Sequence, residues 1–170
     1  FDLKSHQQYS RRKIQYFDSE LNKSYIPYVI ETSIGLDRMF LAIMCNSYKE
    51  EEINDNEKRI VLSIPQFLAP IKLAILPLTK KDGLNEKAKK IFNDLKLEFN
   101  CCYEEKDSIG KRYRRQDAIG TPFCLTIDHQ TLEDDTCTLR YRDKMNQKRV
   151  KIKEVSEIID KEVNMKNFIV

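Results

Sequence analysis

Apolar residues dominate the segment Ile71-Lys-Leu-Ala-Ile-Leu-Pro77, which does most to determine the fold class. So short and apolar a run predicts a strand that is buried on both faces, as in a parallel sheet. A helix is predicted directly downstream, because apolar residues recur there at spacings of three and four. Its apolar positions are Leu84, Ala88, Ile91, Phe92 and Leu95, and its polar side carries Lys87, Lys89 and Lys90.

Strands and helices continue to alternate towards the end of the chain. Residues 100–104 predict a short strand, and residues 108–118 predict a basic helix. Alternating apolar residues predict three further strands, and a helical pattern follows them. The three strands centre on residues 123–127, 137–141 and 150–152, and the last helix covers 155–163. This order predicts an α/β fold, in which helices flank a mixed sheet.

The first part of the chain has a different pattern. Aromatic and β-branched residues in Tyr25-Ile-Pro-Tyr-Val-Ile30 predict a strand. Apolar residues from Leu36 to Met44 then predict a helix. Residues 49–58 hold five acidic and two basic residues, which predicts a hydrophilic connector that few contacts cross. We therefore expect a strand–helix segment at 1–48, an acidic connector at 49–59 and a separate domain at 60–170.

Composition excludes several classes of protein. The chain has 170 residues, of which 41% are hydrophobic, and its formal charge is only +3. No apolar run approaches the roughly 18 residues of a membrane span. No signal-peptide pattern opens the chain, so we expect a cytoplasmic protein without a membrane partner. Because the first residue is Phe rather than Met, we also expect a piece of a longer protein. The five cysteines and two histidines show no zinc-site spacing and predict reduced thiols and no metal site.

Two segments have residues suited to binding or catalysis. In Glu31-Thr-Ser-Ile-Gly-Leu-Asp-Arg38, a carboxylate and a hydroxyl after a strand can hold an ammonium group. The arginine at the start of the following helix can reach a phosphate. Taken alone, this pattern is also ordinary helix-start chemistry. The second segment places four cations at 111–115 around Tyr113. A charge run is usually a solvated face, but the predicted strands carry a second basic face, formed by Arg140, Arg142, Arg149, Lys151 and Lys153. Two basic surfaces favour nucleic-acid binding.

Together these motifs resemble the glycyl-tRNA synthetases of the dimeric class II type. The segment from Tyr25 to Arg38 is similar to the third signature motif of class II aminoacyl-tRNA synthetases. Four later segments are similar to the anticodon-binding domain of that family, namely Leu68-Ala-Pro-Ile-Lys72, Ser108-Ile-Gly-Lys-Arg-Tyr-Arg-Arg-Gln-Asp117, Ile119-Gly-Thr-Pro-Phe123 and Arg140-Tyr-Arg-Asp143. The resemblance covers nearly the whole chain.

The resemblance implies roles for particular residues. Glycine would be bound by Glu31, Thr32, Ser33, Ile34 and Gly35. ATP would be bound by Gly35, Leu36, Asp37 and Arg38, with Arg38 as the catalytic residue that holds the terminal phosphates. tRNA would be bound by Lys111, Arg112, Arg114, Arg115, Arg140 and Arg142. Two positions depart from the family pattern: Thr32 stands where proline is usual, and Ala118 stands where an acid is frequent.

The resemblance also implies an activity for the intact protein. A homodimer would activate glycine with ATP and Mg²⁺ and attach it to tRNA(Gly). The first two signature motifs are expected upstream, so this chain alone would bind the anticodon region, hold no cofactor and lack activity. Three alternatives remain open. They are a non-catalytic relative such as an accessory subunit of mitochondrial DNA polymerase, another class II synthetase (prolyl, threonyl or histidyl), and a purely structural domain.

Overall fold

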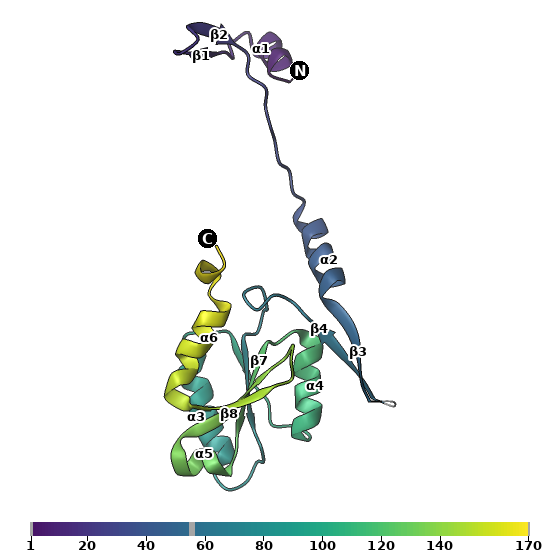
Figure 1. Cartoon of the computed structure of the whole chain (residues 1–170), viewed down its shortest axis with the longest axis vertical. Coiled ribbons are helices and arrows are strands. Elements are labelled where there is room, and N and C mark those ends of the chain that lie inside the picture. The colour runs from purple at the N-terminus through teal and green to yellow at the C-terminus, as the bar shows by residue number, and fades with distance from the viewer. Residues whose placement is uncertain (1, 55–56, 170) are drawn as a thin grey trace. The chain divides into compact units, whose positions relative to one another are not determined.

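The computed structural model describes residues 2–54 and 57–169 (Figure 1). The chain divides into two compact units, Phe1–Leu36 and Asp37–Val170.

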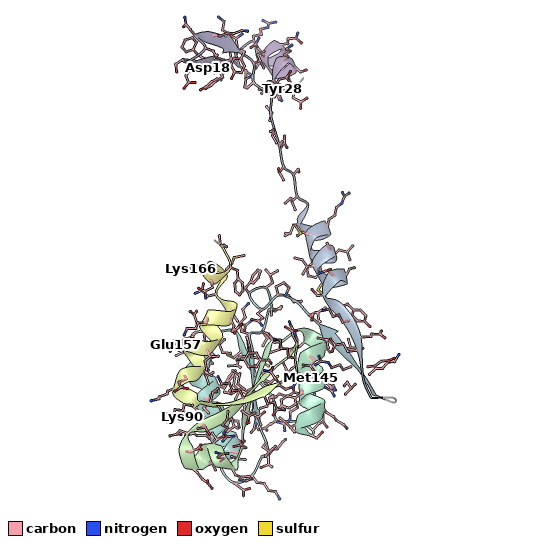
Figure 2. The ribbon with its side chains drawn as sticks, viewed as in Figure 1. Asp18, Tyr28, Lys90, Met145, Glu157 and Lys166 are labelled. Atoms are coloured by element: carbon pink, nitrogen blue, oxygen red, sulfur yellow. The ribbon has the colours of Figure 1, made fainter. Side chains whose placement is uncertain are left out.

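The first unit contains a short helix and a small hairpin. Helix α1 spans Asp2–Ser10, and strands β1 (Tyr16–Asp18) and β2 (Lys23–Tyr25) pair antiparallel. The strand predicted at 25–30 is wrong, because residues 26–35 have no regular structure. A strand needs a neighbour for its backbone hydrogen bonds, and the described residues offer none there. Tyr28 is consequently fully exposed (Figure 2), and Ile30 is 97% exposed.

Helix α2 spans Leu36–Ser47 and confirms the predicted helix. Asp37 lies in its first turn, where a carboxylate interacts favourably with the helix dipole. Most of its apolar side chains are exposed: Leu36 is 82% exposed and Phe40 is 64% exposed, although Ile43 and Met44 are partly buried. An apolar helix of this kind requires a partner surface to be stable in water.

The predicted acidic connector is largely a β-hairpin. Strands β3 (Tyr48–Asn54) and β4 (Glu57–Leu62) pair antiparallel, and β3 begins directly after α2. Residues 55–56 of that predicted connector lie outside the described residues. Arg59 and Val61 are on the inward face of β4 and are buried, whereas Ile60 is half exposed. The hairpin therefore packs on the following domain, contrary to the expectation that few contacts cross this segment.

A five-stranded mixed sheet forms the centre of the second unit. Its order is β6-β5-β7-β8-β9. Strand β5 is parallel to β6 and β7, and β8 is antiparallel to both of its neighbours, β7 and β9. This confirms the predicted α/β fold with helices flanking a mixed sheet. The strands are β5 (Leu73–Pro77), β6 (Cys101–Tyr103), β7 (Phe123–Ile127), β8 (Thr136–Tyr141) and β9 (Gln147–Lys151). The helices are α3 (Leu84–Leu95), α4 (Ile109–Ile119), α5 (His129–Asp134) and α6 (Val155–Val163), with 3₁₀ turns at Ile152–Glu154 and Met165–Asn167.

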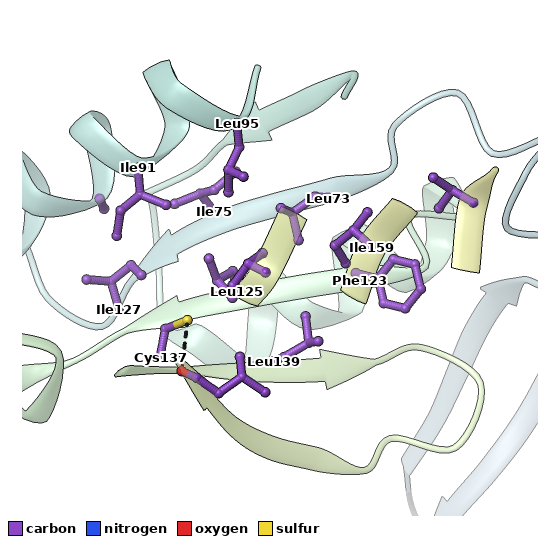
Figure 3. Packing of buried hydrophobic residues seen from close by; sticks show 14 of the residues in the cluster. Leu73, Ile75, Ile91, Leu95, Phe123, Leu125, Ile127, Cys137, Leu139 and Ile159 are labelled. Carbon is purple, nitrogen blue, oxygen red and sulfur yellow. Dashed lines mark hydrogen bonds between the residues drawn. The ribbon is translucent and has the colours of Figure 1, made fainter. Parts of the chain in front are cut away.

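The helices cover the two faces of this sheet unequally. Helices α3 and α6 pack on one face, where Ile91 and Ile159 meet Leu73 and Leu125 in the main apolar cluster (Figure 3). Helix α4 packs on the other face, over a smaller cluster. That cluster joins Ala74, Leu76 and Cys124 to Ile109 and Tyr113. All five residues of β5 are buried, as expected for a strand covered on both faces.

The five cysteines are free thiols. Cys101 packs with the main apolar cluster and Cys102 with the cluster beneath α4, as expected for consecutive residues of one strand. Burial raises the pKa of Cys101 to about 12 and that of Cys102 to about 11. Burial therefore favours the protonated thiol, which is the less nucleophilic form.

Candidate nucleic-acid interface

Helix α4 carries the cations that the sequence singles out. It begins after Ser108 and ends at Gly120, whose φ of 86° is in the left-handed region that glycine favours. Ile109 and Tyr113 face the sheet, while Lys111 faces solvent. The helix thus presents different cations to the interior and to the surface.

Arg112 is an interior residue rather than a surface cation. Its side chain is 1% exposed, and one of its Nη atoms donates to the carbonyl oxygens of Pro77 and Glu104 at 2.7 and 3.2 Å. The other Nη donates to the carbonyl oxygen of Leu78 at 3.3 Å. Arg112 therefore ties α4 to the carboxyl ends of β5 and β6.

Arg140 is also buried, and it binds a carboxylate of α4. Its two Nη atoms donate to the two oxygens of Asp117 at 2.8 and 2.9 Å. Arg59 of the hairpin donates to the same carboxylate at 3.0 Å and to Glu51 at 2.8 Å. The resulting network joins β4, α4 and β8.

Arg142 caps backbone carbonyls around the hairpin. It donates to the carbonyl oxygens of Leu62, Gly120 and Ile64 at 3.1, 2.8 and 2.8 Å, and its Nε donates to Asp143 at 2.7 Å. Arg142 is 2% exposed. Its role in this structure is to fasten the start of the domain to the turn after β8.

The second basic surface predicted from the strands is therefore wrong for Arg140 and Arg142. Alternation correctly places Arg140 and Arg149 on the sheet face opposite the main core. That face is covered at Arg140 by α4, whose Asp117 neutralises the guanidinium. Alternation in the sequence does not show which element covers a sheet face. For this reason the sequence pattern predicts Arg140, which forms a buried ion pair, to be an exposed cation.

Two further cations of α4 are partly exposed and paired. Arg115 donates to Asp107 at 2.9 Å and also binds Glu104. Arg114 lies 3.7 Å from Asp117 and 4.0 Å from the sulfur of Met145, which is in the turn between β8 and β9 (Figure 2). Together with the exposed Lys111, these are the cations on the outer side of α4.

A small cleft adjoins this helix over the open part of the sheet. Its volume is about 220 Å³, and it is lined by Leu78, Ile109, Tyr113, Thr126, Asp128, Thr138 and Gln147. The hydroxyl groups of Tyr113 and Thr126 are 2.5 Å apart. An aromatic ring beside hydroxyl, amide and carboxylate groups can stack a base and bind its edge. Sequence reasoning noted only Tyr113, although the shared face of Thr126 and Thr138 follows from strand alternation.

Asp128 joins this cleft to Arg149. Asp128 caps the N-terminus of α5 by accepting from the backbone of Thr131, and both Nη atoms of Arg149 donate to its carboxylate. Partial burial opposes its ionisation, but the hydrogen bonds from Arg149 and Thr131 outweigh that effect and hold the pKa of Asp128 below its usual range. A charged pair is thus retained at the edge of the cleft.

The predicted substrate-binding residues are all exposed. Glu31, Thr32, Ser33, Ile34 and Gly35 lie in the irregular segment of the first unit. Leu36 ends that unit, whereas Asp37 and Arg38 begin the second. Their roles stay predictions. Within the described ranges, no cluster of three or more His, Cys, Asp or Glu side chains is arranged to hold a metal ion. No helix there has the length and apolar character needed to cross a bilayer.

Comparisons with known proteins identify relatives of this chain. The chain is 48% identical over 94% of its length to a glycine–tRNA ligase of Chlorobaculum tepidum, covering 34% of that protein. It is 48% identical to the Treponema denticola ligase over 99% of its length, covering 38% of that protein. The chain thus spans about a third of the length of the curated relatives it matches. The fold is similar to the RNA-binding domain of a threonyl-tRNA synthetase from Cryptosporidium parvum, with a TM-score of 0.54, 20% identity, and coverage of 59% of this chain and 25% of that one.

The family assignment rests on the sheet and its helices. Residues 72–162, more than half of the chain, match the family described as the anticodon binding domain. This range begins just before β5 and ends within α6, so it contains the whole five-stranded sheet, α4 and the cleft. The chain therefore belongs to the anticodon-binding domain family.

Proposed function

We propose that this chain binds the anticodon region of tRNA(Gly) as part of a glycine–tRNA ligase. The observation that carries the proposal is the identity of about 48% to glycine–tRNA ligases across nearly the whole chain. The family match over residues 72–162 supports the same function.

The geometry of α4 and the cleft supplies the chemistry that such binding needs. Lys111 is exposed on the outer side of α4, and Arg114 and Arg115 beside it are partly exposed and paired with carboxylates. These three cations are our candidates for contacts with the phosphate backbone. The ring of Tyr113 and the polar groups around it suit an unstacked base. Arg112, Arg140 and Arg142 support these elements from the interior, and we assign them no direct contact with RNA.

The activity of the whole ligase belongs to the same proposal. A homodimer in the cytoplasm would activate glycine with ATP and Mg²⁺ and transfer the glycyl group to tRNA(Gly). Glu31 and Ser33 would bind the glycine ammonium group. Thr32, Ile34 and Gly35 would form the adjoining wall of the glycine site. Gly35, Leu36 and Asp37 would contact ATP, and Arg38 its terminal phosphates. The exposed apolar face of α2 supports a larger assembly, since it requires a partner surface.

The alternative functions receive less support. The polymerase accessory subunits and the prolyl, threonyl and histidyl synthetases share this domain type. The sequence relatives at about 48% identity are instead named glycine–tRNA ligases. The threonyl-tRNA synthetase structure, at 20% identity, shows the fold alone.

Titration with tRNA(Gly) tests the proposed binding. We expect the chain to bind tRNA(Gly) more tightly than a tRNA with a different anticodon, and to bind more weakly as salt is added, because phosphate contacts release counterions. Fluorescence anisotropy at several salt concentrations measures both effects. Equal affinity for the two tRNAs, or affinity independent of salt, would contradict the proposal.

A further inference from the structure

A continuous series of side-chain contacts runs from the β3–β4 hairpin to the cleft. Arg59 connects Glu51 to Asp117, and Asp117 binds both Nη atoms of Arg140. The guanidinium carbon of Arg140 lies 4.7 Å from the centre of the Tyr113 ring. The Tyr113 hydroxyl group then meets Thr126, 2.5 Å away, in the wall of the cleft.

Arg140 is committed to this network and is not available to an RNA phosphate. Its side chain is 3% exposed, and the carboxylate it binds is fully buried. Arg59 is a second buried cation on the same carboxylate, and Glu51 offsets its charge. Moving Arg140 outwards would leave Asp117 with one neighbour fewer in a buried site, which is costly.

Two contacts hold the side chain of Tyr113. Arg140 lies over its face, where a guanidinium is attracted to the π-system. Thr126 holds its hydroxyl group. Since Tyr113 is the aromatic side chain of the cleft, its orientation sets how a base can stack there.

We propose that Arg140 is a positioning residue for RNA binding, which Asp117 holds in place and which fixes the ring of Tyr113 for stacking without itself touching the RNA. The inference rests on the proposed function, because it assumes that a base enters the cleft. It assigns Arg140 a role different from the phosphate contact that its sequence pattern suggests.

Salt dependence separates the two roles. Removing a cation that contacts a phosphate reduces the salt slope of binding by about 1. Removing a positioning residue weakens binding but leaves the number of phosphate contacts, and hence the slope, unchanged. The probe is an RNA hairpin with the sequence of the tRNA(Gly) anticodon arm, titrated against the whole chain.

We expect Arg140→Gln to weaken binding of this RNA hairpin by about tenfold, because the stacking of one base is largely lost. The salt slope should match that of the wild type. Tyr113→Leu should weaken binding to a similar extent. The double variant should bind no more weakly than Tyr113→Leu, since Arg140 acts through that ring.

The titration of Tyr113 provides a second readout that needs no RNA. Burial raises the pKa of Tyr113, whereas Thr126 and the charge of Arg140 lower it. Arg140→Gln should therefore raise that pKa further, which pH-dependent NMR of labelled tyrosine measures. If Arg140→Gln does not fold, Arg140→Lys, which keeps the charge, replaces it in the double-mutant cycle with Tyr113→Leu.

Each outcome bears on a defined claim. A salt slope lower by about 1 in Arg140→Gln, or additive effects of the Arg140 and Tyr113 substitutions, would overturn the positioning role alone. Failure of the wild-type chain to bind the RNA hairpin would overturn the proposed function together with this inference. An unchanged slope with non-additive effects supports both.

Discussion

Lys111 and Arg112 are neighbours in the sequence but lie in opposite environments. Lys111 faces solvent on the outer side of α4, whereas Arg112 is buried and donates to three carbonyl groups. One buried nitrogen of Arg112, its Nε, has no hydrogen-bond partner. A buried guanidinium is tolerated only when its other donors are satisfied. The two residues carry the same charge, but their different burial gives them different roles.

Substitution of Arg112 should affect stability first. Arg112→Ala removes the donors to Pro77, Leu78 and Glu104, and we expect the free energy of unfolding to fall by about 2–4 kcal/mol. Lys111→Ala, the matched control, should change it by less than about 0.5 kcal/mol and should weaken RNA binding instead. Urea denaturation and RNA titration measure the two effects. An unfolding midpoint unchanged in Arg112→Ala would contradict the interior role.

Asp128 should make stability depend on pH in acid. Its folded pKa lies below the unfolded value, so its contribution is present above about pH 4 and is lost as the pH falls towards the folded pKa. We expect Asp128→Asn to show a smaller loss of stability than the wild type as the pH falls below about 4. Urea unfolding at each pH measures this difference. If the free energy of unfolding depends on pH in the same way in both proteins, the Asp128–Arg149 pair is not the cause of the acid dependence.

Helix α4 and strand β4 approach each other closely at Gly120. A Cβ atom on Gly120 would lie 3.1 Å from the carbonyl oxygen of Leu62 and 3.3 Å from Ile64. The carbonyl oxygen of Gly120 also accepts from Arg142 at 2.8 Å. The end of the helix and the start of the domain thus approach each other because this residue has no side chain.

A pair of glycine substitutions in α4 tests this contact. Gly120→Ala should lower the free energy of unfolding by about 1–3 kcal/mol, because its φ is positive and the added methyl group meets β4. Gly110→Ala should raise it by about 0.5–1 kcal/mol, since a methyl group there has open space around it and alanine favours the helix. Urea denaturation measures both. A Gly120→Ala variant as stable as the wild type would refute the close approach.

Elements were predictable where their signal is local. The helical spacing of Leu84 to Leu95 and the apolar run at 73–77 identify α3 and β5 without tertiary information. The strand at 25–30 was not predictable in this way, because a strand exists only with a neighbour. For the same reason, the hairpin was not recognisable in the acidic connector predicted at 49–59. Its inward positions include Arg59, whose partner Asp117 is 58 residues away.

The candidate site was predictable in part. The motif at 108–117 correctly identifies α4 as the basic helix, and Lys111, Arg114 and Arg115 remain candidates for tRNA binding. The cleft was missed, since Thr138 and Gln147 come from strands distant in sequence from Tyr113. Pairing between β7, β8 and β9 brings them together, and a single sequence does not reveal strand order.

At the scale of the whole molecule, the chain corresponds to about a third of its curated relatives. The segment from Glu31 to Arg38 ends the first unit and begins the second, and all of its side chains are exposed. Adenylate formation depends on several positioned groups acting at once. We therefore propose that this segment acts only within the complete ligase.

Arg38 should separate activation from tRNA binding in the full-length ligase proposed above. We expect Arg38→Ala to lower glycine-dependent pyrophosphate exchange by about 100-fold or more, as for loss of a charge that stabilises a transition state. Binding of tRNA(Gly) should remain within about twofold, because Arg38 is outside the anticodon-binding region. Arg38→Lys, the control, should retain part of the exchange activity. Equal loss of exchange and binding would mean that Arg38 is structural.

The β3–β4 hairpin also determines where the anticodon-binding domain can be truncated at its N-terminus. A truncation at residue 60 would delete β3 and Arg59 and leave Asp117 with Arg140 as its remaining buried partner. It would also remove the strand that pairs with Val61, which is buried. The smallest portable unit therefore begins at Tyr48, where β3 starts. Because β3 follows α2 without an intervening residue, a junction at Tyr48 lies directly at the end of a helix rather than in a flexible linker.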